Sequence, residues 1–212
     1  MGTRVKSHST QDPTILVPTD LSDIAENALL HGMEIAHACG GNIVLFHVIS
    51  RHPDTSLNMR GPDRRKIIED LNHFREKYEP QYKIPIKPII KEGNLFSALD
   101  KTATLVKPLL MVMGTHGKQG LQHLYGSHAL RVVLGSACPV LVVQKAPTWH
   151  KEIRILLAVN GETDSALVIF WLLILAGARK PVVHLIQISG AGPESDKQAG
   201  IAANLISDRL KR

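Results

Sequence analysis

Between residues 14 and 145, short apolar runs alternate with segments that have helical periodicity. The run at 43–49 is almost wholly apolar, which is typical of a strand covered on both faces. Strands separated by helices pair in parallel through right-handed crossovers. The sequence therefore predicts an α/β fold in three layers, with a five-stranded parallel sheet sandwiched by helices. The candidate strands are 15–18, 43–49, 84–90, 109–113 and 139–143.

Capping and periodicity signals place helices between these strands. Ser22 is a suitable N-cap for a helix that has small apolar residues along one face. Gly40-Gly41 is expected to end that helix. The other expected helices lie around 67–78, at 96–106 and at 128–134.

A second, incomplete copy of the pattern begins near residue 152. Residues 155–160 match 15–20 at an offset of 140 residues, and a strand at 182–186 follows them. The segment 166–176 is apolar enough for a buried core helix, and 197–210 has a helical pattern. A natural truncation of a tandem protein and a fragment of one both remain open. The predicted organisation is a flexible N-terminus at 1–12, a complete unit at 13–146 and a partial βαβα repeat at 152–212.

The main functional motif follows the fourth candidate strand. Gly114 and Gly117 form a glycine-rich turn, and Gly126-Ser127 then opens the fourth helix. Glycines let the backbone approach an anion without a Cβ in the way, and the N–H groups of a helix N-terminus attract it. Asp20 follows the first strand, and ligands of such sheets bind beyond the carboxyl ends of strands. The pattern favours a phosphate site where these segments meet.

The same residues also have plainer interpretations. Gly114 and Gly117 could form only a turn from strand to loop. Asp20 could act only on the dipole of the helix that follows it, and Ser127 could act only as an N-cap. Ligand binding is preferred because the glycine turn, the helix start and Asp20 converge on one edge of the expected sheet.

Composition excludes several function classes. The formal charge of +6 comes from basic residues spread along the chain, and only 4% of residues are aromatic, which disfavours nucleic-acid binding. No apolar run reaches the roughly 18–20 residues of a membrane span, and residues 1–12 lack the apolar core of a signal peptide. Cys39 and Cys138 are too isolated for a disulfide framework or a zinc site. A cytoplasmic location is therefore expected, with no membrane partner.

The histidines do not predict a metal site. His116, His123 and His128 lie close in sequence, but their spacing does not suit one helix face and no carboxylate or cysteine lies among them. His47 and His184 lie in apolar strands and are expected to be hydrogen-bonded core or strand-end residues. No general base stands near the glycine turn, so no catalytic residue is assigned and any ATP hydrolysis is expected to be slow.

Several of these motifs together resemble the universal stress protein (UspA-like) family, over residues 13–145 and weakly over 152–212. The family's fold is a five-stranded parallel α/β sandwich of the adenine nucleotide alpha hydrolase-like type. In its nucleotide-binding members, nine residues separate the second glycine from Gly-Ser or Gly-Thr, whereas eight separate Gly117 from Gly126 here. The carriers are Pro18-Thr19-Asp20, His47-Val48, the segment 112–117, Gly126-Ser127 and the segment 138–143.

The resemblance implies a site for an adenine nucleotide, ATP or AMP, which can bind together with an Mg²⁺ ion. Asp20 and the backbone of Val48 would face the adenine and ribose, and Met113 and Gly114 would line the sugar side. The remaining glycines and the start of the fourth helix would hold the phosphates. The full set is Pro18, Thr19, Asp20, Val48, Met113, Gly114, Gly117, Gly126, Ser127 and His128.

The implied role is a stress-response sensor or switch that is not a dedicated enzyme and is at most a slow ATPase. An alternative is a nucleotide-free, dimeric interaction module whose shortened loop has lost the pocket. A small-molecule transferase on a similar fold is disfavoured, because no second substrate domain with acid or base residues follows. In the family the fifth strand pairs with its counterpart in another domain, which here predicts a homodimer through 140–143.

Overall fold

The computed structural model describes residues 12–49, 64–115, 127–144, 153–176, 181–188 and 192–210. The chain forms two compact units, one ending at Pro147 and one beginning at Thr148. We call them the N-terminal unit and the C-terminal unit and describe each by itself. Among the described residues, no helix is both long and apolar enough to cross a bilayer.

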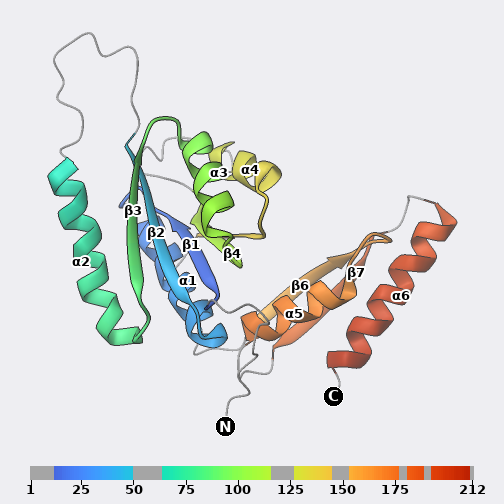
Figure 1. Ribbon diagram of the computed structural model, residues 1–212. Helices are drawn as coiled ribbons and strands as arrows, with labels where there is room; N and C mark the ends of the chain where they lie inside the picture. The colour runs from blue at the N-terminus through green and yellow to red at the C-terminus, as the bar shows by residue number, and fades with distance from the viewer. Residues whose placement is uncertain are drawn as a thin grey trace. The chain divides into compact units, whose positions relative to one another are not determined.

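The N-terminal unit contains a five-stranded sheet in which every neighbouring pair is parallel (Figure 1). The order β3-β2-β1-β4-β5 places β1 in the centre, where the direction of winding reverses. The predicted five-stranded parallel sheet is thereby confirmed. Its strands are β1 (Thr14–Pro18), β2 (Asn42–Ile49), β3 (Ile86–Glu92), β4 (Leu110–Gly114) and β5 (Val140–Val143).

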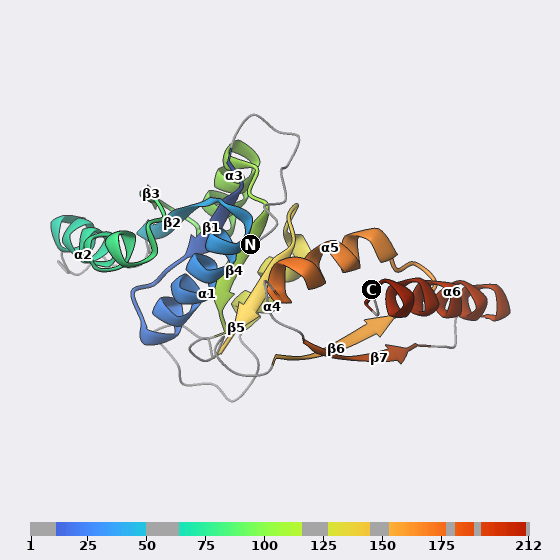
Figure 2. The same ribbon diagram turned by 90° about the horizontal axis from the view of Figure 1, so that it is seen from below.

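Helices cover both faces of this sheet, and α1 and α3 lie on opposite sides of it (Figures 1 and 2). On the α1 side, Gly32 lies against Val17 and Ile43. On the other side, Leu16 and Phe46 pack in one buried cluster with residues of α3 and α4. Successive residues of a strand point to opposite faces of the sheet, so the strands contribute to one hydrophobic core on each face, as expected for a three-layer sandwich. The helices are α1 (Asp23–Cys39), α2 (Arg64–Tyr82), α3 (Leu95–Val106) and α4 (Ser127–Gly135).

The predicted boundaries of α1 are confirmed by its caps. The Ser22 hydroxyl accepts a hydrogen bond from the Ala25 N–H at 3.2 Å, which satisfies one of the free donors of the first turn. Gly40 ends the helix in the left-handed region with φ of 68° and donates its N–H to the Ala36 carbonyl. Both signals are local, so they can be recognised from neighbouring residues.

The third strand begins two residues later than expected. Pro85 has no N–H to donate, although its carbonyl accepts from the Ile43 N–H at 2.9 Å. Regular pairing therefore starts only at Ile86, which lies opposite Ile43. β3 is the last strand on its side of the sheet, a position in which proline residues are tolerated.

A polar cluster links α1 to α2. The Glu26 carboxylate accepts hydrogen bonds from the Tyr78 hydroxyl and from the Lys77 ammonium, whose Nζ lies 2.8 Å from Oε1. Partial burial acts to raise the pKa of Glu26, but the hydrogen bonds from Lys77 and Tyr78 outweigh it and lower the pKa. Burial and the hydrogen bond to Glu26 raise the pKa of Tyr78. The cluster thus favours an ionised Glu26 in the folded protein.

This cluster predicts a pH-dependent contribution to stability. A carboxyl with a lowered folded-state pKa stabilises the fold above its unfolded pKa, and that contribution is lost as pH falls through the folded pKa. Glu26→Gln should therefore lower the free energy of unfolding by about 1 kcal/mol at pH 7. The difference from wild type should shrink below about pH 4. Urea unfolding at pH 7 and below about pH 4 tests this prediction. An equal difference in the free energy of unfolding between variant and wild type at the two pH values would contradict it.

The C-terminal unit has the element order β6-α5-β7-α6, with β6 and β7 paired in parallel. Both helices pack on one face of the two strands, around Val159, Leu172 and Ile206. Within α5, Leu172 and Ile174 are buried as expected, but Leu167 and Leu173 are exposed. The expectation of a buried core helix is therefore met only in part among the described residues. The elements are β6 (Arg154–Val159), α5 (Ser165–Ala176), β7 (Val182–Gln187) and α6 (Pro193–Leu210).

Candidate functional site

The carboxyl ends of β1 and β4 lie side by side at the centre of the sheet. Their ladder pairs Ile15 with Leu110 and Leu16 with Met111, so both strands run toward the same edge. The winding direction reverses between these strands, and ligands of open α/β sheets bind in the crevice at such a point. The structure thus brings the chain segments that carry Asp20 and Gly114 to one edge, as the sequence predicted.

Asp20 is held in a tight turn between β1 and α1. Its Oδ1 accepts from the Ser22 N–H at 3.1 Å and from the Ser22 hydroxyl at 2.6 Å. The same hydroxyl accepts from Ala25, so the carboxylate is tied directly to the N-cap of α1. Leu21 between them has φ of 64°, which is uncommon for a residue other than glycine. The turn fixes a negative charge at the positive end of a helix.

Hydrogen bonds that involve Thr19 and His47 hold the end of β1 against β2. The Thr19 N–H donates to the Phe46 carbonyl at 2.8 Å, and His47 Nδ1 donates to the Thr19 carbonyl at 2.8 Å. Because a carbonyl can only accept, Nδ1 must carry the hydrogen in this contact. His47 is therefore a hydrogen-bonded strand-end residue, as predicted. Val48 follows it and, by the register of β1 with β2, reaches the same edge as Asp20.

Gly114 is the last residue of β4, and the first turn of α1 lies against it. A Cβ on Gly114 would stand 2.6 Å from Ile24 Cγ2 and 3.2 Å from the Ile24 carbonyl oxygen. The glycine is therefore required by helix packing, a role that sequence reasoning missed. Only the close approach of α1 reveals it, because Ile24 and Gly114 are 90 positions apart in the chain.

The phosphate half of the predicted site is only partly described. Gly117 and Gly126 lie outside the described residues, as do His116 and His123. Helix α4 begins at Ser127, with His128 as its second residue, one position earlier than the expected helix. Pro18 and Met113 belong to the ends of β1 and β4 at the same edge of the sheet. Within the described ranges, no group of three potential metal ligands occurs.

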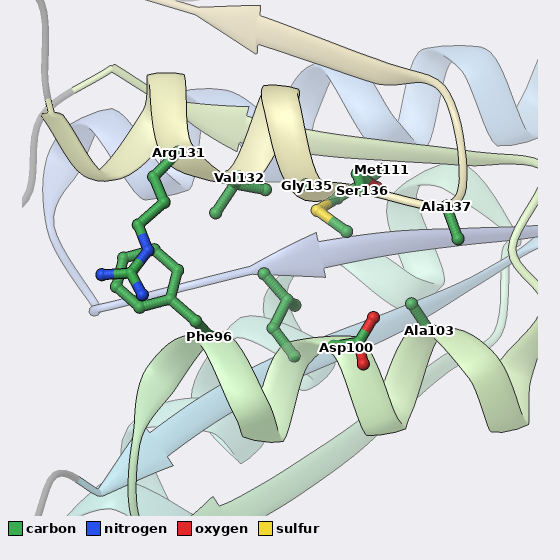
Figure 3. Close-up of a pocket in the computed structure, with 10 residues that line it drawn as sticks. Phe96, Asp100, Ala103, Met111, Arg131, Val132, Gly135, Ser136 and Ala137 are labelled. Atoms are coloured by element: carbon green, nitrogen blue, oxygen red, sulfur yellow. The ribbon is translucent and has the colours of Figure 1, made fainter.

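A pocket of roughly 200 Å³ lies elsewhere, between α3 and α4 (Figure 3). Its floor is apolar, and the Arg131 guanidinium carbon stands 4.0 Å above the centre of the Phe96 ring at one end. None of the residues predicted to bind a nucleotide lines this pocket, so it is separate from the edge at Asp20. Its lining residues are Phe96, Leu99, Asp100, Ala103, Met111, Arg131, Val132, Gly135, Ser136 and Ala137.

Comparison with known proteins gives a consistent assignment. The model of the universal stress protein family matches residues 13–144. Universal stress protein MJ0531 of Methanocaldococcus jannaschii is 31% identical over 140 residues, which span 62% of this chain and 81% of the relative.

Two solved structures share the fold. A universal stress protein in complex with cAMP has a TM-score of 0.50 and 22% identity, covering 65% of this chain and 100% of that chain. A universal stress protein chain from Pseudomonas aeruginosa has a TM-score of 0.63 and 17% identity, covering 95% of this chain and 71% of its own. The matched region contains the whole five-stranded sheet and the edge at Asp20 and Gly114. The chain therefore belongs to the universal stress protein family.

Proposed function

We propose that the N-terminal unit binds an adenine nucleotide, ATP or AMP, at the sheet edge formed by β1, β2 and β4. The observation that carries this proposal is the placement of Asp20 and Gly114 at the carboxyl ends of adjacent central strands. The turn that ties Asp20 to Ser22 orients a carboxylate there, ready to accept hydrogen bonds from ribose hydroxyls. The relative solved with cAMP supports the choice of ligand, because cAMP also joins adenine, ribose and phosphate.

The proposal gives each segment a separate task. Pro18, Thr19, Asp20 and the backbone of Val48 contact the adenosine part. Met113 and Gly114 line the sugar, and Gly117, Gly126, Ser127 and the His128 N–H hold the phosphates. The start of α4 suits this task because the first N–H groups of a helix have no partner within the helix.

We further propose that the nucleotide acts as a signal and is not the substrate of a fast reaction. In the described part of this edge, the Asp20 carboxylate is tied to Ser22 at the start of α1, and the His47 ring is tied to the Thr19 carbonyl. A rapid ATPase positions a nucleophilic water and neutralises developing phosphate charge. We therefore expect a cytoplasmic sensor or switch that hydrolyses ATP slowly if at all, with Mg²⁺ as an optional companion of the phosphates.

The alternative is an interaction module without nucleotide. Two observations favour it. The spacing of eight residues between Gly117 and Gly126 is one short of the family motif, and the packing of Gly114 against Ile24 explains that glycine without a ligand. In either case we propose a homodimer through β5, which ends the sheet and leaves one row of its backbone groups without a neighbouring strand in the described unit.

Nucleotide that stays bound during purification distinguishes nucleotide binding from the nucleotide-free interaction module. The protein should be purified without added nucleotide, denatured with acid, and the supernatant analysed by ion-exchange chromatography against ATP, ADP and AMP standards. Binding at this edge predicts an adenine nucleotide in the supernatant, or calorimetric binding of added ATP or AMP to protein that was purified empty. An empty protein that also fails to bind added nucleotide would support the interaction module.

A further inference from the structure

The His47 side chain replaces a backbone donor where β1 ends against β2. In a regular parallel ladder the Thr19 N–H bonds the Phe46 carbonyl, and the next bond runs from the Val48 N–H to the Thr19 carbonyl. The first of these bonds is present at 2.8 Å. Among the described residues the second is not formed, and the Thr19 carbonyl accepts instead from His47 Nδ1 at 2.8 Å. The ladder between β1 and β2 therefore stops one bond early.

The pairing pattern shows which way the Val48 N–H points. The backbone groups of successive residues in a strand face alternate sides. The Ile49 carbonyl accepts from the N–H of Gly93, which follows β3, whereas the Phe46 carbonyl accepts from Thr19 at the end of β1. Val48 lies two residues after Phe46, so its N–H faces the side of β1. Because β1 has ended there, this N–H points toward the carboxyl edge where the nucleotide is proposed to bind.

The C-terminal unit contains the regular version of the same strand end. At the offset of 140 residues, Val159 corresponds to Thr19, and the ladder of β6 with β7 has the same register as that of β1 with β2. Ile188 corresponds to Val48. The Ile188 N–H donates to the Val159 carbonyl at 2.8 Å, so this ladder makes the bond that the N-terminal unit lacks.

The residue at the histidine position differs between the two units. Gln187 corresponds to His47, and its Nε2 donates to the Asp196 carbonyl in the first turn of α6 at 3.1 Å. The Gln187 amide is thus directed to a helix, and the Val159 carbonyl accepts a backbone N–H. The side chain that follows the last paired residue of the second strand therefore decides whether the ladder continues.

We propose that His47 is a positioning residue for the nucleotide, because its ring leaves the Val48 N–H for the adenine. This inference rests on the function proposed above for the same edge. Thr19 is only 8% exposed, and a buried carbonyl needs a donor. The histidine supplies that donor without using the backbone of Val48. An adenine ring nitrogen accepts hydrogen bonds, so a backbone N–H is a suitable partner for it.

Loss of the ring should restore the regular ladder and weaken nucleotide binding. In His47→Leu the Val48 N–H should bond the Thr19 carbonyl, as Ile188 bonds Val159. The affinity for ATP and AMP, measured by calorimetry, should fall about tenfold. The thermal midpoint should stay close to wild type, because one hydrogen bond replaces another. His47→Asn should keep the wild-type affinity, because its side-chain amide can donate to the same carbonyl.

Amide hydrogen exchange followed by NMR tests the ladder itself in the protein without nucleotide. The Val48 N–H should exchange roughly tenfold more slowly in His47→Leu than in wild type, because it gains a hydrogen bond. In His47→Asn it should exchange at the wild-type rate. Gln187→Leu is the matched control, since it changes the corresponding residue of the C-terminal unit. Nucleotide affinity and Val48 exchange should both stay at wild-type values in this control.

The outcomes separate this inference from the proposed function. A wild type that binds neither ATP nor AMP overturns the proposed function and the inference with it. A wild type that binds nucleotide, together with an unchanged affinity in His47→Leu, overturns the inference alone. Equal losses of affinity in His47→Asn and His47→Leu, or an unchanged exchange rate of the Val48 N–H in His47→Leu, also overturn the inference alone.

Discussion

Asp20→Ala is expected to weaken adenine-nucleotide binding by about 10- to 100-fold. That range corresponds to the loss of a hydrogen bond to a charged group, which contributes about 1.5–3 kcal/mol. The substitution also removes the acceptor that holds the Ser22 N–H and hydroxyl, so the loop between β1 and α1 should loosen slightly. Isothermal titration calorimetry with ATP and with AMP measures the affinity. An unchanged affinity would exclude Asp20 from the site.

Two controls separate direct contact from loss of the turn. Asp20→Asn keeps an oxygen that can accept from Ser22 but removes the charge, so weaker binding with unchanged thermal stability would indicate direct contact with the nucleotide. Asn160 is the matched position in the C-terminal unit, where its Oδ1 accepts from the Glu162 N–H at 3.1 Å. Asn160→Ala removes the same kind of turn contact away from the proposed site, and we expect nucleotide affinity to stay at the wild-type value.

Gly114→Ala is expected to destabilise the fold as well as the site. The added Cβ meets Ile24 Cγ2 at 2.6 Å and the Ile24 carbonyl oxygen at 3.2 Å, so α1 must move away from the end of β4. Overpacking of this kind costs about 1–3 kcal/mol. The thermal midpoint should fall by about 2–12 °C for a chain of this size. Differential scanning calorimetry measures the midpoint, and a midpoint within error of wild type would contradict the packing role.

The control for this substitution is Gly135→Ala. Gly135 ends α4, and a Cβ added there would have no neighbouring atom within 4 Å, so alanine should be neutral or slightly stabilising. Adding Ile24→Ala to Gly114→Ala should recover part of the lost stability, because it removes the Cγ2 atom that clashes. No recovery would indicate that the destabilisation arises from the strand backbone and not from the contact with α1.

Much of the N-terminal unit was predictable because its signals are local. Ser22 and Gly40 mark the two ends of α1 through hydrogen bonds to residues three or four positions away. The apolar run of β2 indicated burial on both faces, and the alternation of strands and helices then implied parallel pairing. The meeting of Asp20 and Gly114 at one edge followed from that topology and needed no knowledge of individual contacts.

Other features depend on contacts between distant parts of the chain. The need for glycine at position 114 comes from Ile24, and the ionised state of Glu26 comes from Tyr78 and Lys77 on another helix. The apolar strand around His184 predicted a hydrogen-bonded core or strand-end residue, whereas the His184 side chain is exposed within β7, because exposure depends on which elements reach that face.

The sequence by itself determined the order of strands and helices, their approximate limits and the residues that reach the carboxyl edge of the sheet. Hydrophobic periodicity and helix capping involve residues only a few positions apart, so they can be recognised in the sequence itself. Only the tertiary structure decided that α1 packs against Gly114 and that Leu156 and Ile186 are exposed among the described residues of their unit. Packing and exposure depend on which residues are close in space. The order of residues along the chain does not show which distant residues become such neighbours.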